Sequence, residues 1–219
     1  MKEMMKNRTY RDKIVYCAKD PRFVLIQMVD DHDLAVIGSE VRSIKAEADF
    51  CLIALRVEDW NRDLSPWKAP AVFGNEDFGG GAEETLSTLL AEMGDEAKRY
   101  YIGGYSLAGL FALWAAYQTD RFVGVAAASP SMWFPGFVEY MKERPIRTPG
   151  VYLSLGDREE RTRNPIMATV GDCIRKGRDI LRAQGVQCVL EWNKGNHFKD
   201  PDLRTAAGFT WLLSERYTR

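Results

Sequence analysis

Runs of apolar residues on consecutive positions recur along the chain, and segments with helical periodicity separate them. Consecutive apolar positions are typical of strands buried on both faces, and their alternation with helices favours a parallel sheet. The predicted strands are 13–18, 23–29, 50–57, 100–103, 123–128, 151–155 and 187–192. We therefore predict an α/β fold with a mostly parallel central sheet and helices on both faces.

Helical periodicity predicts helices at 82–93, at 164–184 and from residue 200 onward, the last two opening with a capping residue followed by proline. One uncharged stretch, 100–119, is long enough to cross a bilayer. Gly103, Gly104 and Ser106 interrupt this stretch. We therefore interpret it as a buried strand, a turn and a helix over 108–117 rather than as a membrane span.

The composition fits a protein with a full core and gives no sign of a nucleic-acid partner. Hydrophobic residues make up 46% of the 219 positions, and 30 basic residues nearly balance 31 acidic ones. A chain of this length forms one or two domains, and we predict one domain over 1–219. The near-neutral charge gives no electrostatic reason to expect nucleic acid or an anionic membrane as a partner.

Four cysteines, at positions 17, 51, 173 and 188, are widely spaced and form no CxxC pair. This spacing fits neither a metal site nor a disulfide scaffold. Each cysteine lies in an apolar run, so we expect small buried thiols in a reducing cytosol. The N-terminal residues lack the apolar core of a signal peptide. Together these features predict a cytoplasmic protein.

The segment 103–109 has the pattern of a nucleophile elbow, because it follows a predicted buried strand and leads directly into a helix. A serine on such a tight turn needs small residues two positions before and after it, and Ser106 has Gly104 and Ala108 there. The helix start also allows the backbone N–H of Leu107 to face a developing oxyanion. The alternative is a serine that only caps a helix.

A nucleophilic serine needs a base, and the chain has two histidines, His32 and His197. Hydrolases with this elbow have the order serine, acid, histidine, which His197 fits and His32 does not. The acid should follow strand 151–155, where three carboxylates stand close together. Glu159 is our first choice, Asp157 the second and Glu160 the third.

The oxyanion site needs a second backbone donor, which such folds take from the loop after an earlier strand. The residues at that position are 30–33, and the N–H of Asp31 or His32 is the candidate. The same Asp-Asp-His-Asp cluster has an alternative interpretation as a metal site. We favour the oxyanion role and predict no metal, because adjacent side chains on an extended chain point in alternating directions.

Two long connections, 58–81 and 129–150, are candidates for substrate contacts. The second is too short for a large lid, so we expect an open cleft. Its aromatic lining would come from Trp60, Trp67 and Trp133, with Arg62 or Lys68 available for an anionic group. The alternative is that each tryptophan belongs to the core.

Four segments resemble motifs of one esterase family. Residues 104–113 read Gly-Tyr-Ser-Leu-Ala-Gly-Leu-Phe-Ala-Leu, 129–133 read Ser-Pro-Ser-Met-Trp, 61–66 read Asn-Arg-Asp-Leu-Ser-Pro and 195–198 read Gly-Asn-His-Phe. They resemble the elbow, the Ser-Pro-Ser-x-Trp segment, the Arg-x-Arg-Asp-Leu-Thr-Pro loop and the histidine segment of the α/β-hydrolases that include esterase D and the catecholate-siderophore esterases. Residues 24–31 resemble a family strand that ends in Leu-Asp-Gly, with Asp31 in place of the glycine.

The resemblance implies a cofactor-free enzyme with Ser106 as nucleophile and His197 as base, acting on a small-molecule ester. We therefore expect a serine hydrolase that cleaves carboxylic or thio esters through an acyl-enzyme. The expected fold is a compact α/β-hydrolase without the first strands of the full fold. The alternatives are an acyltransferase on the same scaffold and a non-catalytic binding module. The acyl and alcohol groups and the oligomeric state stay open.

Overall fold

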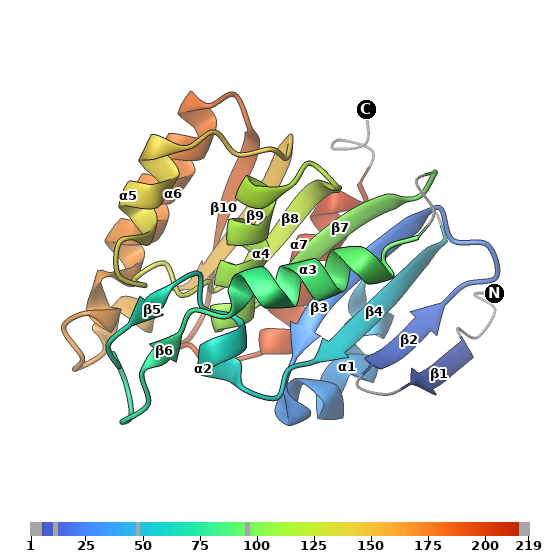
Figure 1. Cartoon of the computed structure of the whole chain (residues 1–219), viewed down its shortest axis with the longest axis horizontal. Coiled ribbons are helices and arrows are strands. Elements are labelled where there is room, and N and C mark those ends of the chain that lie inside the picture. The colour runs from blue at the N-terminus through green and yellow to red at the C-terminus, as the bar shows by residue number, and fades with distance from the viewer. Residues whose placement is uncertain (1–5, 11–12, 47–48, 95–96, 215–219) are drawn as a thin grey trace.

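The computed structural model describes residues 6–10, 13–46, 49–94 and 97–214, which build an eight-stranded sheet in the order β1-β2-β4-β3-β7-β8-β9-β10 (Figure 1). The strands are β1 (Lys6–Tyr10), β2 (Lys13–Cys17), β3 (Phe23–Val29), β4 (Phe50–Arg56), β7 (Arg99–Tyr105), β8 (Phe122–Ala128), β9 (Gly150–Gly156) and β10 (Gln187–Asn193). Within this sheet the neighbours from β4 through β3, β7, β8 and β9 to β10 pair in parallel. At one edge, β1 pairs antiparallel with β2 and β2 pairs antiparallel with β4.

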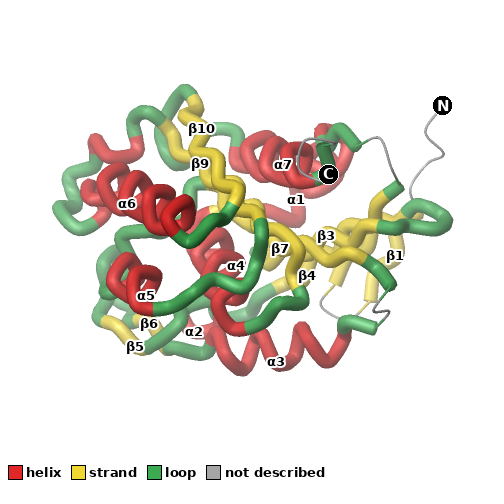
Figure 2. Tube along the Cα trace, turned by 90° about the horizontal axis from the view of Figure 1, so that it is seen from above, coloured by secondary structure: helices red, strands yellow, loops and turns green. Residues whose placement is uncertain are grey.

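Helices cover both faces of this sheet, as the alternation of apolar and helical segments predicts. The helices are α1 (Asp31–Ser43), α2 (Trp60–Asp63), α3 (Ala82–Glu92), α4 (Ser106–Gln118), α5 (Phe137–Glu143), α6 (Val170–Ala183) and α7 (Pro201–Leu212), with 3₁₀ turns η1 (Glu159–Arg161) and η2 (Met167–Thr169). Viewed from above, α1 and α7 lie on one side of the sheet and α3 to α6 on the other (Figure 2). Two short strands, β5 (Lys68–Ala69) and β6 (Phe78–Gly79), pair separately.

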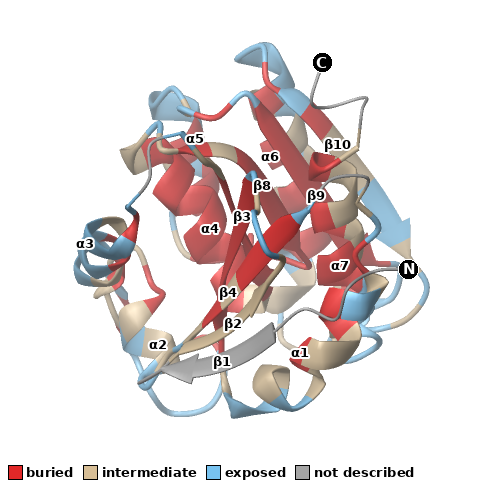
Figure 3. Ribbon diagram, turned by 90° about the vertical axis from the view of Figure 1, so that its right-hand side faces the viewer, coloured by how far each residue is buried: buried red, intermediate tan, exposed pale blue. Residues whose placement is uncertain are grey.

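The centre of the fold is β7 followed by α4, the uncharged stretch of the sequence. All residues of α4 from Leu107 to Tyr117 are buried, and Figure 3 shows buried residues concentrated in α4 and the central strands. The segment is therefore a strand, a turn and a helix, as predicted. Among the helices of the described residues, none combines the length and apolar character that crossing a membrane requires.

Two expectations about the first third of the chain are wrong. We expected the first strands of the full fold to be missing, but β1, which no predicted strand covers, pairs with β2 (the predicted strand 13–18) and extends the sheet at its antiparallel edge. We also expected residues 30–33 to form a loop, but Asp30 caps α1, which begins at Asp31. The side chain of Asp30 accepts a bond from the backbone of Asp33, and the side chain of Asp33 accepts one from the backbone of Asp30. This reciprocal capping box starts the helix.

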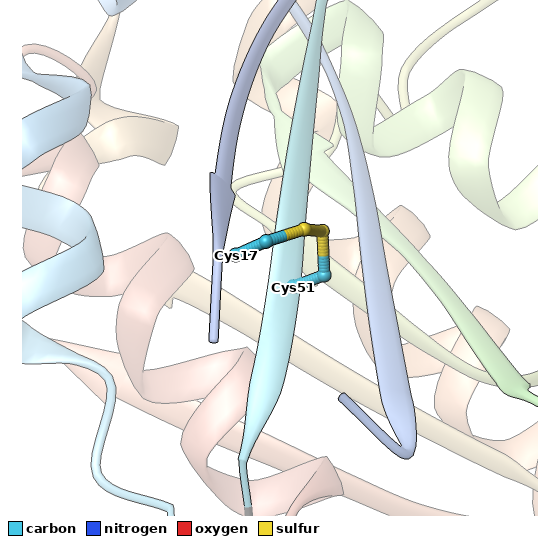
Figure 4. The surroundings of a disulfide bond; sticks show 2 residues. All are labelled: Cys17 and Cys51. Carbon is cyan, nitrogen blue, oxygen red and sulfur yellow. A yellow bond between two sulfur atoms is a disulfide. The ribbon is translucent and has the colours of Figure 1, made fainter. Parts of the chain in front are cut away.

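The expectation of four free thiols is also wrong. Cys17 on β2 and Cys51 on β4 are direct partners in the antiparallel register and form a disulfide, with their Cα atoms 4.1 Å apart (Figure 4). Only Cys173 and Cys188 are free among the cysteines. The sequence places the two bonded residues 34 positions apart, and only the pairing of β2 with β4 brings them together. The thiol argument for a reducing compartment therefore does not apply to this pair.

Candidate active site

Ser106 lies at the turn between β7 and α4, at the carboxyl edge of the sheet. Its φ of +56° is in the left-handed region, which is strained for a residue with a side chain. The turn is tight because Gly104 packs against the first turn of α4: a Cβ on Gly104 would stand 2.7 Å from that of Ala108. The turn therefore has no room for a larger side chain at Gly104.

Ser106, His197 and Glu159 form a continuous chain of hydrogen bonds, which we call the Ser–His–Glu chain. The Oγ atom of Ser106 lies 3.0 Å from Nε2 of His197, and Nδ1 of the same ring lies 2.7 Å from Oε2 of Glu159. The three residues follow β7, β10 and β9, whose carboxyl ends lie at the same edge of the sheet because these strands are parallel. His32, the other histidine, is exposed on α1 and lies outside this chain.

The three candidate acids have different partners. Glu159 alone contacts the imidazole. Asp157 accepts the backbone N–H of Gly195 at 2.8 Å and so ties the loop after β9 to the loop that carries His197. Glu160 forms an ion pair with Arg175 on α6 at 3.2 Å. Of the three carboxylates, the first choice, Glu159, is the one with a hydrogen bond to the ring.

Glu159 is buried, with only 4% of its side chain exposed, but it stays ionised. Burial acts to raise the pKa of this carboxyl, and the bond from His197 and those from Ser129 Oγ and Gly156 N–H outweigh burial, so the pKa is lowered overall. Both of the latter donors lie 2.7 Å from Oε1. A carboxylate that accepts several such bonds holds its charge in the interior.

Compared by sequence, the chain matches no protein-family model and no curated protein. Compared by structure, it is similar to an IroE-like serine hydrolase from Shewanella oneidensis (TM-score 0.72, 12% identity, 96% of this chain and 79% of that one). It is also similar to the siderophore hydrolase EstB from Aspergillus nidulans (TM-score 0.67, 16% identity, 94% of this chain and 90% of that one). A third similar structure is the enterobactin esterase FES from Shigella flexneri (TM-score 0.62, 14% identity, 97% of this chain and 60% of that one). The chain has an α/β-hydrolase fold.

In an α/β-hydrolase the oxyanion site lies between the helix after the serine and the loop after a neighbouring strand. Here α4 starts at Ser106 without a side-chain cap, and Leu107 follows in its first turn. Strand β3 lies beside β7 and leads into α1, so the N–H groups of Asp31 and His32 are in the first turn of a second helix at the same edge. Both candidate donors therefore belong to the first turns of helices that follow neighbouring parallel strands.

The carboxylate of Asp31 has its own partner. Arg56 binds both of its oxygens, at 2.7 and 3.1 Å, and this bond lowers the pKa of the Asp31 carboxyl. The capping box occupies Asp30 and Asp33. The carboxylates that suggested a metal site are thus committed to other contacts, and in the described part of the chain no group of three or more His, Cys, Asp or Glu residues is placed to hold a metal ion.

The aromatic residues expected to line a cleft are largely packed against each other. Trp67 donates its indole N–H to the carbonyl of Pro135 at 3.0 Å and contacts the rings of Phe134 and Tyr140. Trp133, 8% exposed, packs edge-on against Phe73.

Trp60 and Arg62, which were also predicted to contact substrate, have partners within the protein as well. Trp60 is partly buried against the main core. Arg62 is paired with Asp63 and Glu84, at 2.7 and 2.6 Å. Lys68 is exposed on β5. The structure therefore gives Trp60, Trp67 and Arg62 structural contacts and shows none between them and the Ser–His–Glu chain.

Four residues around the Ser–His–Glu chain were missed as site residues by the sequence-based reasoning. They are Tyr105, Ser129, Ser131 and Arg204. The Oγ atom of Ser131 lies 3.3 Å from that of Ser106, and its N–H donates to the Ser106 carbonyl at 3.1 Å. The Ser-Pro-Ser-x-Trp segment was a usable signal for Ser129 and Ser131, whereas nothing local marks Arg204.

Proposed function

We propose that the protein is a serine hydrolase that cleaves small carboxylic or thio esters through an acyl-enzyme on Ser106. The observation that carries this proposal is the hydrogen-bonded continuity of the Ser–His–Glu chain, at 3.0 and 2.7 Å. The names of the similar structures, which include a serine hydrolase and two esterases of siderophores, support the same class of reaction.

In the first half of the reaction, Ser106 Oγ attacks the ester carbonyl while Nε2 of His197 takes the hydroxyl proton. Glu159 accepts the Nδ1–H bond, which sets the tautomer and stabilises the imidazolium that forms. The carbonyl electrons move onto oxygen, where the N–H of Leu107 and that of Asp31 or His32 stabilise the negative charge. Collapse of the tetrahedral intermediate breaks the bond to the alcohol or thiol, which leaves with the proton from His197.

In the second half, water replaces the leaving group. His197 takes a proton from the water, the resulting hydroxide attacks the acyl carbon, and the acid leaves as the proton returns to Ser106. The hydroxyl of Ser131 helps to position Ser106 before each attack. All of these groups belong to the chain itself.

Labelling with a fluorophosphonate, followed by mass measurement of the intact protein, tests the nucleophile. We expect one covalent adduct, which Ser106→Ala abolishes and Ser131→Ala retains. Ester hydrolysis by Ser106→Ala should fall by at least about 10⁴-fold. An adduct on Ser106→Ala, or none on the wild type, would contradict the proposal.

Short p-nitrophenyl esters test the base. Turnover should be lost in His197→Ala and kept in His32→Ala, which serves as its control. The reverse result would overturn the choice of base, and no turnover in the wild type would favour a non-catalytic binding module. Faster transfer to an added alcohol than to water would indicate an acyltransferase instead.

A further inference from the structure

We propose that Arg204 of α7 is a positioning residue that holds both the acid and the histidine loop of the Ser–His–Glu chain and extends activity toward lower pH. This inference rests on the proposed hydrolase function. Arg204 is 4% exposed, and its guanidinium contacts the oxygen of Glu159 that the imidazole does not contact.

One nitrogen of the guanidinium contacts the acid and its neighbours. Nη1 donates to Oε1 of Glu159 at 2.9 Å, to the hydroxyl of Tyr105 at 3.0 Å and to Oγ of Ser129 at 3.2 Å. The other oxygen of Glu159 accepts from His197. The carboxylate is therefore held between the arginine and the imidazole, with its plane fixed by both.

The other nitrogen contacts the loop that carries the histidine. Nη2 donates to the backbone carbonyls of Lys194 and Asn196, at 3.3 and 3.1 Å. Tyr105 adds a second restraint, because its hydroxyl donates to the carbonyl of His197 at 2.6 Å. Burial raises the pKa of Tyr105 to about 12, so this hydroxyl keeps its proton. Arg204 thus links the acid directly to the backbone just before His197 and, through Tyr105, to the carbonyl of His197.

The planar fork of arginine suits this task because its donors point in several fixed directions at once. A lysine carries the same charge on a single flexible ammonium group and cannot reproduce the five contacts. The contacts join η1, β7, the end of β8 and the loop after β10 to α7. Loss of the fork should therefore misplace groups that come from four separate segments.

The charge of Arg204 has a separate consequence for protonation. With Arg204 present, uptake of a proton by the Glu159–His197 pair creates a buried net positive charge. Without it, the same proton neutralises a buried negative charge. Removal of the arginine charge must therefore favour the protonated, inactive pair, whichever of the two residues holds the proton.

Other ionisable groups near this cluster are more exposed or neutral. Asp157, Glu191, Lys194, Lys199 and Asp200 are exposed, and Asp202 is half-buried. Tyr152, which packs near Arg204, donates to Glu191, and burial holds its pKa well above the ordinary value. Exposed charges are screened by solvent, whereas the charge of Arg204 is buried and lies 2.9 Å from Glu159.

The test compares Arg204→Met, which removes fork and charge, with Arg204→Lys, which keeps only the charge. Arg175→Met is the control, because Arg175 pairs with the neighbouring Glu160 on the surface. The readouts are kcat and KM for a short p-nitrophenyl ester from pH 5 to 9, with circular dichroism to confirm folding.

For Arg204→Met we expect the acidic limb of the pH profile to move up by about one pH unit. We also expect kcat to fall about 10- to 100-fold, with KM little changed. For Arg204→Lys we expect a lower kcat than in the wild type. The acidic limb of its pH profile should stay near the wild-type position, because lysine keeps the positive charge. Arg175→Met should match the wild type.

An acidic limb of Arg204→Met that coincides with the wild type would overturn the electrostatic part of the inference. If Arg204→Met does not fold, Arg204→Lys decides, and an unchanged kcat in that variant would overturn the positioning role. These outcomes need an active wild type. Absence of turnover and of fluorophosphonate labelling in the wild type would instead refute the proposed function itself.

Discussion

Glu159 and Glu40 are both buried, with 8% and 3% of their surface exposed, but their surroundings differ in hydrogen-bond donors. Glu159 accepts bonds from His197, Ser129, Gly156 and Arg204. Glu40, on α1, accepts one bond, from the Gln27 amide at 3.2 Å. Its Oε1 and the Oε1 of Gln27 have no hydrogen-bond partner among the described residues.

The number of donors decides the charge state of each carboxyl. Burial raises the pKa of Glu40 well above its ordinary value, the single bond from Gln27 opposes this only weakly, and the nearby Asp33 and Asp202 raise it further. The pKa of Glu159 is lowered. Burial alone therefore does not neutralise a carboxyl, and a buried anion that serves a reaction needs donors on both of its oxygens.

The largest expected effect comes from replacing each glutamate with glutamine. Glu159→Gln should lower kcat for ester hydrolysis by about 10³- to 10⁴-fold, because an amide orients the imidazole in the wrong tautomer. Glu40→Gln should leave kcat within about twofold, since Glu40 makes no contact with the Ser–His–Glu chain. Steady-state kinetics on the two purified variants makes the comparison. Equal losses in both would show that burial, not donor contacts, decides the role.

The disulfide gives the next largest effect, on stability rather than on rate. Cys17→Ala combined with Cys51→Ala should lower the free energy of unfolding by about 2–4 kcal/mol, because the bond closes a loop of 34 residues. Cys173→Ser, at a free cysteine, should change it little. Urea unfolding measures both, and kcat of the folded double variant should stay near wild type. A large loss of kcat would couple this sheet edge to the reacting groups.

The smallest effect is the pH dependence of stability. A carboxyl whose pKa is raised by folding binds its proton more tightly in the native state, so its stabilising contribution is lost as pH rises. For Glu40 this loss begins above the ordinary value of 4.5, and for Asp33, whose pKa is raised to about 6, it spans about pH 4 to 6. Burial is the main cause of the raised pKa of both carboxyls.

Glu40→Gln should therefore unfold at higher urea concentration than the wild type at pH 8, with the difference narrowing toward pH 5. Asp33→Asn should remove a smaller part of the decrease in stability with rising pH, the part that falls below pH 6. Urea midpoints measured across pH 4 to 8 test both variants. A difference between Glu40→Gln and wild type that does not vary with pH would indicate a packing change instead.

The parts predicted from sequence are those with local causes. The turn at Ser106 follows from a buried strand, two small neighbours and an apolar helix within a few positions. The preference for Glu159 over Asp157 follows from its spacing after strand β9. The strand boundaries lie within about two residues of those predicted, because burial on both faces leaves continuous apolar runs.

The features missed depend on contacts between distant segments. Helix α1 buries only Ile37, Glu40 and Val41, so its apolar pattern is too weak to indicate a helix. From its sequence position, Arg204 is indistinguishable from a surface residue of an amphipathic helix. Its role depends on the packing of α7 against the loop after β10. Trp67 was predicted to contact substrate, and its ring contacts with Phe134 and Tyr140 could not be foreseen because these residues come from a distant segment.

The long separation between Ser106 and His197 has a consequence for the order of synthesis. The ribosome completes the elbow 91 residues before it adds the imidazole, and Arg204 comes later still. A nascent chain therefore exposes a serine that has nothing to accept its proton. Under the proposed function, the order of synthesis therefore keeps the hydroxyl without its base until the chain has passed His197.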